Sequence, residues 1–448
     1  MRGGKARNLS ATAVLLGCPT LILTVFSALR LAGDAGPTSV TAAPARPQIM
    51  ATGEVPLAAP TRGEALMEAA ARRAANGDLA AADEQYRLAW REPGTRTAAA
   101  DALRELHRTP GFRLPTDEDA IGRSVRLLGP GFRRSETPHF VILSDCAADW
   151  TQGRARVLER ARDQFFRVAA RMGAPVYPHR SKLLCVLFAR RDDYAAFARA
   201  HDGMDAGWIA GYYATLSNRI VFYNDSTSPA FAAAGQKLAD ADVQVRALRD
   251  RALDAEREGR APAAAQLRSH ADDLDRQVRS ERKRLGKAAG DSSTAKATHE
   301  ATHLLAFNTG LQLPDREYPF WISEGLATSF ETDRADSAFG PDRAEGRSDR
   351  RQRFEELRKD GKLIPLTELV ARCEAPRDDA DRADAMYAQS CVLFTSLFGK
   401  DPRALGAFLS DLAEGPPTRL TEEMALSAFR ARFGDPDQVD QRVLRRSR

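Results

Sequence analysis

The stretch SSTAKATHEATHLLAFNTG, residues 292–310, decides how this chain of 448 residues is interpreted. It contains the pattern HExxH, in which His299 and His303 stand four positions apart. On a helix these positions share one face, so both imidazoles can bind one ion. Glu300 projects from the same helix and can act as a general base toward water instead of as a ligand. The alternative is a structural helix whose histidines are favoured by its dipole.

Ser293 is expected to be the N-cap of this helix, and Gly310 to follow its end. Working outward, the segment WISEGLA, residues 321–327, predicts a second apolar helix. Glu324 is a lone carboxylate among its apolar neighbours, and such a group needs a cation or metal partner when it is buried. The alternative is an ordinary carboxylate near a helix N-terminus.

A catalytic zinc site needs three protein ligands and one open position. We therefore expect one Zn²⁺ per chain, held by His299, His303 and Glu324. The metal would activate water, and Glu300 would take the proton as that water attacks a carbonyl.

These two segments resemble the gluzincin metallopeptidases and the related peptidase-MA-like domains. Members combine HExxH with a Glu on a following helix, often within W-x-x-E-G-x-A. The chain is most similar to the aminopeptidase N and leukotriene hydrolase branch, closely over residues 299–331 and loosely over the rest of 138–448 outside a predicted hairpin. The resemblance implies a zincin-like catalytic domain with peptidase activity.

The same branch implies roles for three further residues. Tyr387 matches a tyrosine that steadies the oxyanion and is therefore a second expected catalytic residue beside Glu300. Glu331 matches a carboxylate that supports a ligand histidine, and Asn308 matches an asparagine beside the metal helix, so both are expected around the ligands. The alternative for Tyr387 is an aromatic side chain that packs at the edge of the hydrophobic core. The alternative for Glu331 is a solvent-exposed carboxylate on a helix.

Departures from that branch favour an endopeptidase over an exopeptidase. The chain lacks the G-x-M-E-N segment with which those aminopeptidases hold a free N-terminus. Its edge-strand candidate, residues 211–215, has no carboxylate. A substrate strand could add to the sheet at residues 211–223, which would make recognition largely main-chain based. Two other functions stay open: a non-enzymatic helical scaffold with a vestigial zinc site, and a zinc hydrolase of a non-peptide amide.

The N-terminus predicts export. Arg2, Lys5 and Arg7 precede an apolar run, which is the order of a signal peptide or an uncleaved signal anchor, assigned to residues 1–45. The expected location is periplasmic, extracellular or membrane-anchored with the catalytic domain outside. The balance of 66 Lys+Arg against 61 Asp+Glu gives a net charge of +5, which does not indicate a nucleic-acid partner. The expected partner is a peptide or protein substrate.

The chain is expected to form an α+β fold that is mostly helical toward its C-terminus. The expected parts are a linker (46–62), a tetratricopeptide-like helical region (63–130), an α+β part with a small mixed sheet (131–231), an inserted antiparallel helical hairpin (232–291), and the metal helix with a helical C-terminal part (292–448).

The inserted hairpin has a heptad-like, coiled-coil seam among many charges. The hairpin is either an arm that binds a partner or substrate or a solvent-exposed extension without a binding role. Four cysteines follow the signal segment, none with metal-ligand spacing, and they are either core thiols or disulfide partners. They are Cys146, Cys185, Cys373 and Cys391.

Overall fold

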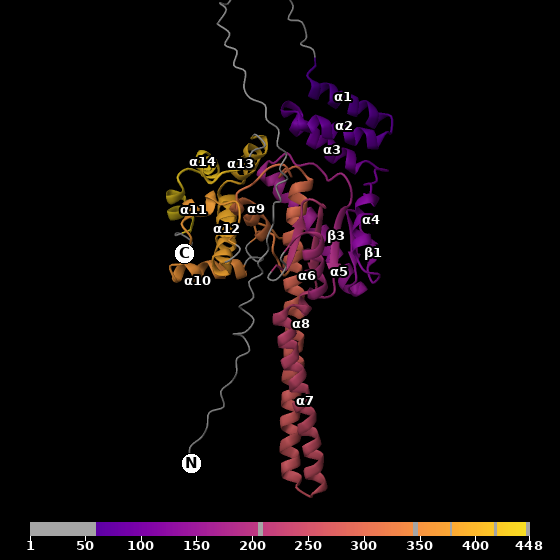
Figure 1. The fold of residues 1–448 in the computed structure, drawn as a ribbon, viewed down its shortest axis with the longest axis vertical. Helices are drawn as coiled ribbons and strands as arrows, with labels where there is room; N and C mark the ends of the chain where they lie inside the picture. Colours follow the sequence, from indigo (N-terminus) through magenta and orange to yellow (C-terminus); the bar gives the residue numbers. More distant parts are fainter. Residues whose placement is uncertain (1–59, 205–208, 344–347, 377–378, 416–418, 445–448) are drawn as a thin grey trace, which may run out of the picture. The chain divides into compact units, whose positions relative to one another are not determined.

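The computed structural model describes residues 60–204, 209–343, 348–376, 379–415 and 419–444 (Figure 1). Two compact units meet in sequence at Phe112 and Arg113, which is earlier than the expected boundary after residue 130. The predicted signal segment, 1–45, lies outside the described residues. Among the helices that are described, none is both long enough and apolar enough to cross a membrane.

The described part of the N-terminal unit contains the helices α1 (Arg62–Ala75), α2 (Leu79–Arg91) and α3 (Arg96–Arg108). A capping box between Thr61 and Glu64 starts α1, and the Asp78 side chain caps α2. Alanines fill much of the buried face of α2 and α3, which lets the helices pack closely. A short 3₁₀ turn at Pro93–Thr95 separates these two helices.

Helix α4 (Glu118–Leu127) belongs to the second unit. The buried guanidinium of Arg219, on a strand of the sheet, donates to the Ser124 hydroxyl over 3.0 Å. Arg134 bonds both carboxylate oxygens of Glu118 at 2.7 Å. These contacts tie α4 to the sheet, which explains why the boundary lies before it.

The second unit is built around one five-stranded sheet, which confirms the α+β class. The strands lie in the order β1-β2-β3-β5-β4, with β2, β3 and β5 parallel and both edge strands antiparallel to their neighbours. The core strands are buried along their whole length. Their bounds are β1 (Arg133–Glu136), β2 (Phe140–Ser144), β3 (Leu183–Phe188), β4 (Gly211–Ala214) and β5 (Arg219–Tyr223).

Helices α5 (Ala148–Met172) and α6 (Arg191–His201) connect the strands and pack on the sheet. Gly173 follows α5 with φ 64°, a left-handed conformation that ends the helix and that glycine adopts without strain. A 3₁₀ turn at Asp225–Thr227 follows β5 and leads into the hairpin.

The hairpin consists of α7 (Pro229–Arg257) and the first part of α8 (Ala261–Asn308), side by side in Figure 1. Gly259, with φ 74°, makes the turn between them. The prediction that Ser293 caps a new helix is wrong, because α8 runs unbroken for 48 residues and Ser293 is buried inside it. Helix α8 ends at Asn308, and Gly310 then takes φ 78°, as expected for a stop.

The remaining described elements of regular structure are helical. Helix α9 packs on α12 at a glycine: a Cβ on Gly325 would lie 2.7 Å from the Ser390 carbonyl oxygen and 2.8 Å from the Phe394 Cβ. This explains the glycine of the WISEGLA segment. The helices are α9 (Phe320–Thr328), α10 (Ser348–Lys359), α11 (Leu366–Ala371), α12 (Ala380–Lys400), α13 (Pro402–Glu414), α14 (Glu422–Phe433) and α15 (Pro436–Val439), before a final turn at Asp440–Leu444.

The four described cysteines are free thiols. Cys146, Cys185 and Cys391 are buried and Cys373 is half-buried. Burial raises the pKa of the Cys146 thiol to about 11, so this group is neutral at physiological pH.

Candidate metal centre

The residues of α8 from Lys296 to Phe307 are buried, in contrast to the largely exposed hairpin part of the same helix. They contact α5, α9, β4 and β5. Lys296 anchors this part: its fully buried Nζ donates to the Asp225 carboxylate at 2.7 Å and to the Tyr223 carbonyl at 2.9 Å. Ser293 donates to the other oxygen of Asp225 at 3.1 Å. These bonds fix the helix against the end of β5.

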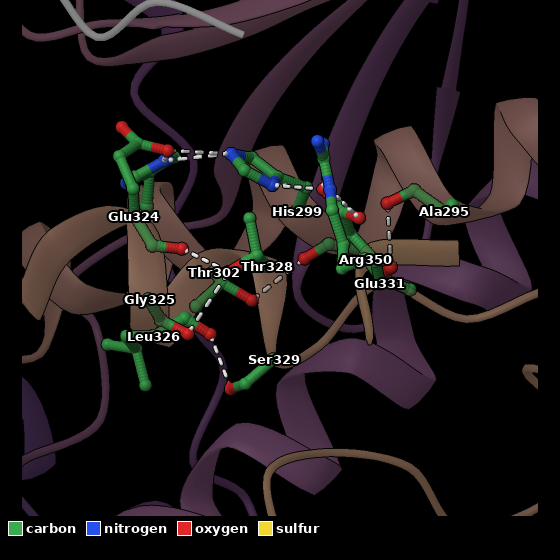
Figure 2. A network of polar contacts seen from close by, with 12 residues as sticks. Ala295, His299, Thr302, Glu324, Gly325, Leu326, Thr328, Ser329, Glu331 and Arg350 are labelled. Atoms are coloured by element: carbon green, nitrogen blue, oxygen red, sulfur yellow. Dashed lines mark hydrogen bonds and ion pairs between the residues drawn. The ribbon is translucent and has the colours of Figure 1, made fainter. Parts of the chain in front are cut away.

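The donor atoms of the three predicted ligands converge one turn beyond Lys296. The Nε2 atoms of His299 and His303 are 3.1 Å apart. Oε2 of Glu324, on α9, lies 3.2 Å from the first of these nitrogens and 3.4 Å from the second. Figure 2 shows the Glu324 carboxylate turned toward the His299 ring. The three side chains are the one group in the described chain that could hold a metal ion in this way.

These distances fit a metal ion. Zinc bonds of about 2.1 Å in a tetrahedron place neighbouring donors roughly 3.4 Å apart, close to the spacings among the three donor atoms. Two imidazoles and one carboxylate are also a donor set of catalytic zinc sites, where the fourth position stays open. All three residues are at most 2% exposed, so little water competes for the donors.

Charges around the ligands stabilise a cation there. The pKa of His299 is raised to about 10, because hydrogen bonds to Glu324 and Glu331 outweigh the opposite effect of burial. The pKa of Glu324 is lowered despite burial by His303 and His299. A buried carboxylate that stays ionised beside two imidazoles keeps a positive charge at this point, carried by a proton when no metal is bound.

Glu331 contacts His299 on the ring nitrogen that faces away from the other two donors. Its Oε1 is 3.0 Å from Nδ1 of that ring. A carboxylate at Nδ1 fixes the tautomer that presents Nε2 to a metal and fixes the ring's orientation. The pKa of Glu331 is lowered to about 2: the Arg350 charge and the His299 bond overcome the effect of burial.

Glu300 is fully buried, and neither of its carboxylate oxygens has a hydrogen-bond partner among the described residues. Burial raises its pKa to about 8, with the charge of His299 opposing the shift and that of Glu324 adding to it. A Cβ on Gly211 would lie 3.1 Å from Oε1 of Glu300. The edge strand β4 therefore passes directly beside this carboxylate, and a larger residue than glycine would crowd it.

Tyr387 lies on α12 and is fully buried. Its ring is edge-on to the ring of Phe320, and the two ring centroids are 5.0 Å apart. Its hydroxyl has no hydrogen-bond partner among the described residues. Burial and the charge of Glu324 raise its pKa well above the ordinary value, so the hydroxyl keeps its proton. It is thus a neutral donor in the neighbourhood of the ligand carboxylate.

Asn308 makes its hydrogen bonds away from the ligand side chains. Its side chain exchanges two hydrogen bonds with Asn218, at 2.9 and 2.7 Å, and donates to the Leu304 carbonyl. Asn218 sits in the turn between β4 and β5 with φ 47°. Asn308 therefore fastens the β4–β5 hairpin to the end of the metal helix rather than supporting a ligand directly.

Three residues around the site, Lys296, Arg350 and Gly211, have roles that were not predicted from the sequence. Lys296 stands four positions before Glu300 on the helix, a spacing that signals a shared face. Arg350 donates to both oxygens of Glu331 at 2.9 and 3.0 Å, but it lies 19 residues away and had no local signal. The role of Gly211 depends on contact between distant segments.

Part of the chain is similar to a known family. The model of a family described as a protein of unknown function, DUF1570, matches residues 293–419, which include the three ligands, Glu331 and Tyr387. No curated protein matches the chain. No solved structure matches it either.

Proposed function

We propose that this protein is an exported zinc metallopeptidase of the gluzincin type, with a zincin-like catalytic fold. The observation that carries the proposal is the convergence of three buried donor atoms within 3.1–3.4 Å, beside a buried carboxylate without a hydrogen-bond partner among the described residues. A structural metal site needs no such carboxylate, whereas hydrolysis needs a general base.

His299, His303 and Glu324 would hold the metal, and Glu331 would keep the His299 ring in place. Bound Zn²⁺ would supply Lewis acidity that activates water at neutral pH. Glu300 would accept a proton from the attacking water and pass it to the leaving nitrogen. Its raised pKa, about 8 before the metal adds its charge, matches a group that gains and loses a proton near neutrality.

Tyr387 would donate a hydrogen bond from its hydroxyl to the oxyanion that forms on the substrate carbonyl. Two features support this role: the hydroxyl stays protonated, and it has no competing acceptor among the described residues. An oxyanion donor of this kind contributes about 3 kcal/mol to transition-state stabilisation.

The substrate would be an extended peptide. Strand β4 ends the order of the described sheet, so one side of its backbone is not paired within that sheet, and β4 passes beside Glu300 at Gly211. A peptide added to this edge would lie next to the general base and would be held by main-chain bonds. Such binding needs no free terminus, which favours an endopeptidase.

The test combines metal analysis with Glu300→Gln. Purified protein should contain about one zinc per chain and should cleave members of a diverse peptide library at internal bonds. Glu300→Gln should keep the zinc and lose about 10²–10⁴-fold in rate. Glu281→Gln, which changes a half-buried carboxylate on the hairpin part of the same helix, is the matched control and should leave both unchanged.

Other outcomes would contradict the proposal. Protein purified at neutral pH that neither contains nor takes up zinc would exclude the metal site. Bound zinc without peptide cleavage would favour hydrolysis of a non-peptide amide. A partner that binds equally well to Glu300→Gln, and only while the hairpin is intact, would favour the scaffold function.

A further inference from the structure

Arg350, on α10, is a buried cation that the functions proposed above do not use. It is 9% exposed, although an unpaired arginine would be costly to bury. Its Nε donates to Oε2 of Glu331 at 2.9 Å, and Nη2 donates to Oε1 at 3.0 Å. This two-point contact fixes the plane of the carboxylate as well as its position.

The carboxylate held by Arg350 is the one that holds a ligand. Oε1 of Glu331 receives Nη2 of Arg350 and also lies 3.0 Å from Nδ1 of His299. Figure 2 shows the order guanidinium, carboxylate, imidazole running toward Glu324. A tilt of the Glu331 carboxylate would therefore turn the His299 ring and move its Nε2.

The other side of the guanidinium meets α12. Arg350 lies over the ring of Tyr387, with Cζ 5.4 Å from the ring centroid, and Nη1 is 3.8 Å from Oδ1 of Asp384. Asp384 and Tyr387 are three positions apart on α12 and share a face. One side chain thus contacts both the carboxylate that orients a ligand and the ring of the proposed oxyanion donor.

We propose that Arg350 is a positioning residue of the metal centre, which sets the orientation of the His299 ring through Glu331 and the place of the Tyr387 ring through direct contact. The proposal rests on the proposed zinc site. Lysine cannot replace arginine here without loss, because an ammonium lacks the planar fork that grips both carboxylate oxygens.

The same helix offers a matched control. Arg353 lies one turn after Arg350 and bonds the same Asp384, with Nε 2.5 Å from Oδ2. Its second ion-pair partner is Glu356, on its own helix. Substituting Arg353 perturbs the packing of α10 on α12 and leaves the contact between Arg350 and Glu331 in place.

The experiment measures metal binding in Arg350→Met, Arg350→Lys and Arg353→Met, all in the full chain. Zinc affinity is determined by chelator competition, and the visible spectrum of the Co²⁺-loaded protein reports the ligand geometry. Arg350→Met should weaken zinc binding about 10- to 100-fold and change the cobalt spectrum. The zinc affinity of Arg350→Lys should lie between those of Arg350→Met and the wild type. Arg353→Met should have the zinc affinity and the cobalt spectrum of the wild type.

Thermal unfolding of the metal-free proteins separates positioning from folding. If Arg350→Met does not fold, the zinc affinity and cobalt spectrum of Arg350→Lys test the inference, because this variant keeps the buried positive charge. Wild-type affinity and an unchanged cobalt spectrum in every folded Arg350 variant would overturn the inference, and so would an equal loss in Arg353→Met. Failure of the proposed function is distinct: in that case the wild-type protein itself would bind no metal, or would bind it without hydrolysing peptides.

Discussion

Helix α8 joins two regions that are helical for different reasons. In the hairpin part, one narrow seam is buried, made by residues such as Ala264, Ala271 and Val278 at seven-residue spacing. Its outer faces carry exposed ion pairs. In the metal part, every residue from Ala297 to Phe307 is buried, including His299 and Glu300. The first region follows a repeating pattern, whereas the second depends on specific buried partners.

Because of this difference, removing a charged side chain should change the free energy of unfolding by unequal amounts in the two parts. Lys296→Met should lower the free energy of unfolding by about 3–5 kcal/mol, because it leaves Asp225 buried beside Tyr223 without its cation. Arg249→Met removes a cross-hairpin bond to Asp275 that solvent already screens, so it should have a much smaller effect. Urea unfolding measures both, and equal losses would contradict the comparison.

Metal binding should make the metal part sensitive to pH. His299 has a pKa of about 10 in the metal-free protein, so it is protonated throughout pH 6–8 and a metal must displace that proton. Zinc affinity should therefore rise with pH, by about tenfold per unit for each proton released.

Chelator competition at pH 6, 7 and 8 measures this slope. Titration calorimetry in two buffers of different ionisation enthalpy counts the protons that are released. An affinity that does not change over this range would show that the ligand group binds no extra proton when it lacks a metal.

Replacing glycine by alanine should lower stability where the surroundings are tight and raise it where they are open. Gly325→Ala should lower the free energy of unfolding by about 1–3 kcal/mol, because the new Cβ would meet the Ser390 carbonyl of α12. Gly286, in the exposed part of α8, has open space around its Cβ position, so Gly286→Ala should raise stability by about 0.5–1 kcal/mol. Thermal and urea unfolding check the signs, and two losses would show that α8 is constrained at Gly286.

The hairpin should tolerate shortening. Cross-helix pairs such as Arg249 with Asp275 and Arg268 with Glu256 define its register. Deleting 249–255 together with 269–275 removes facing segments and keeps the seven-residue seam. Zinc affinity and peptide hydrolysis should stay within about twofold of the full chain, since the sites are distant. A larger loss in either measurement would mean that the length of the hairpin contributes to the site.

The sequence predicted the elements that have a local pattern. The small mixed sheet expected within residues 131–231 is present, and HExxH with Glu324 located the three converging donors. The predicted break before the metal helix was wrong. Ser293 was expected to begin a new helix, but packing on α7, α5 and the sheet keeps the chain helical there.

Other features depend on contacts between distant segments and had no local pattern. The contact of Arg350 with Glu331, the clearance at Gly211 beside Glu300, and the pairing of Asn308 with Asn218 each join separate elements. The resemblance supplied the position of Glu331 but not the cation that holds it. The resemblance also placed Asn308 near the ligands. In the structure, its side chain instead bonds Asn218 in the turn between β4 and β5.

The continuity of α8 has a mechanical consequence. At 1.5 Å per residue, the hairpin tip at Ala261 is roughly 57 Å along the axis from His299, with no interruption in the helix between them. The two imidazoles therefore lie near one end of a single continuous helix whose other end is the hairpin tip. A sideways force at the tip reaches the histidine turn as torque, multiplied by the length of helix between them.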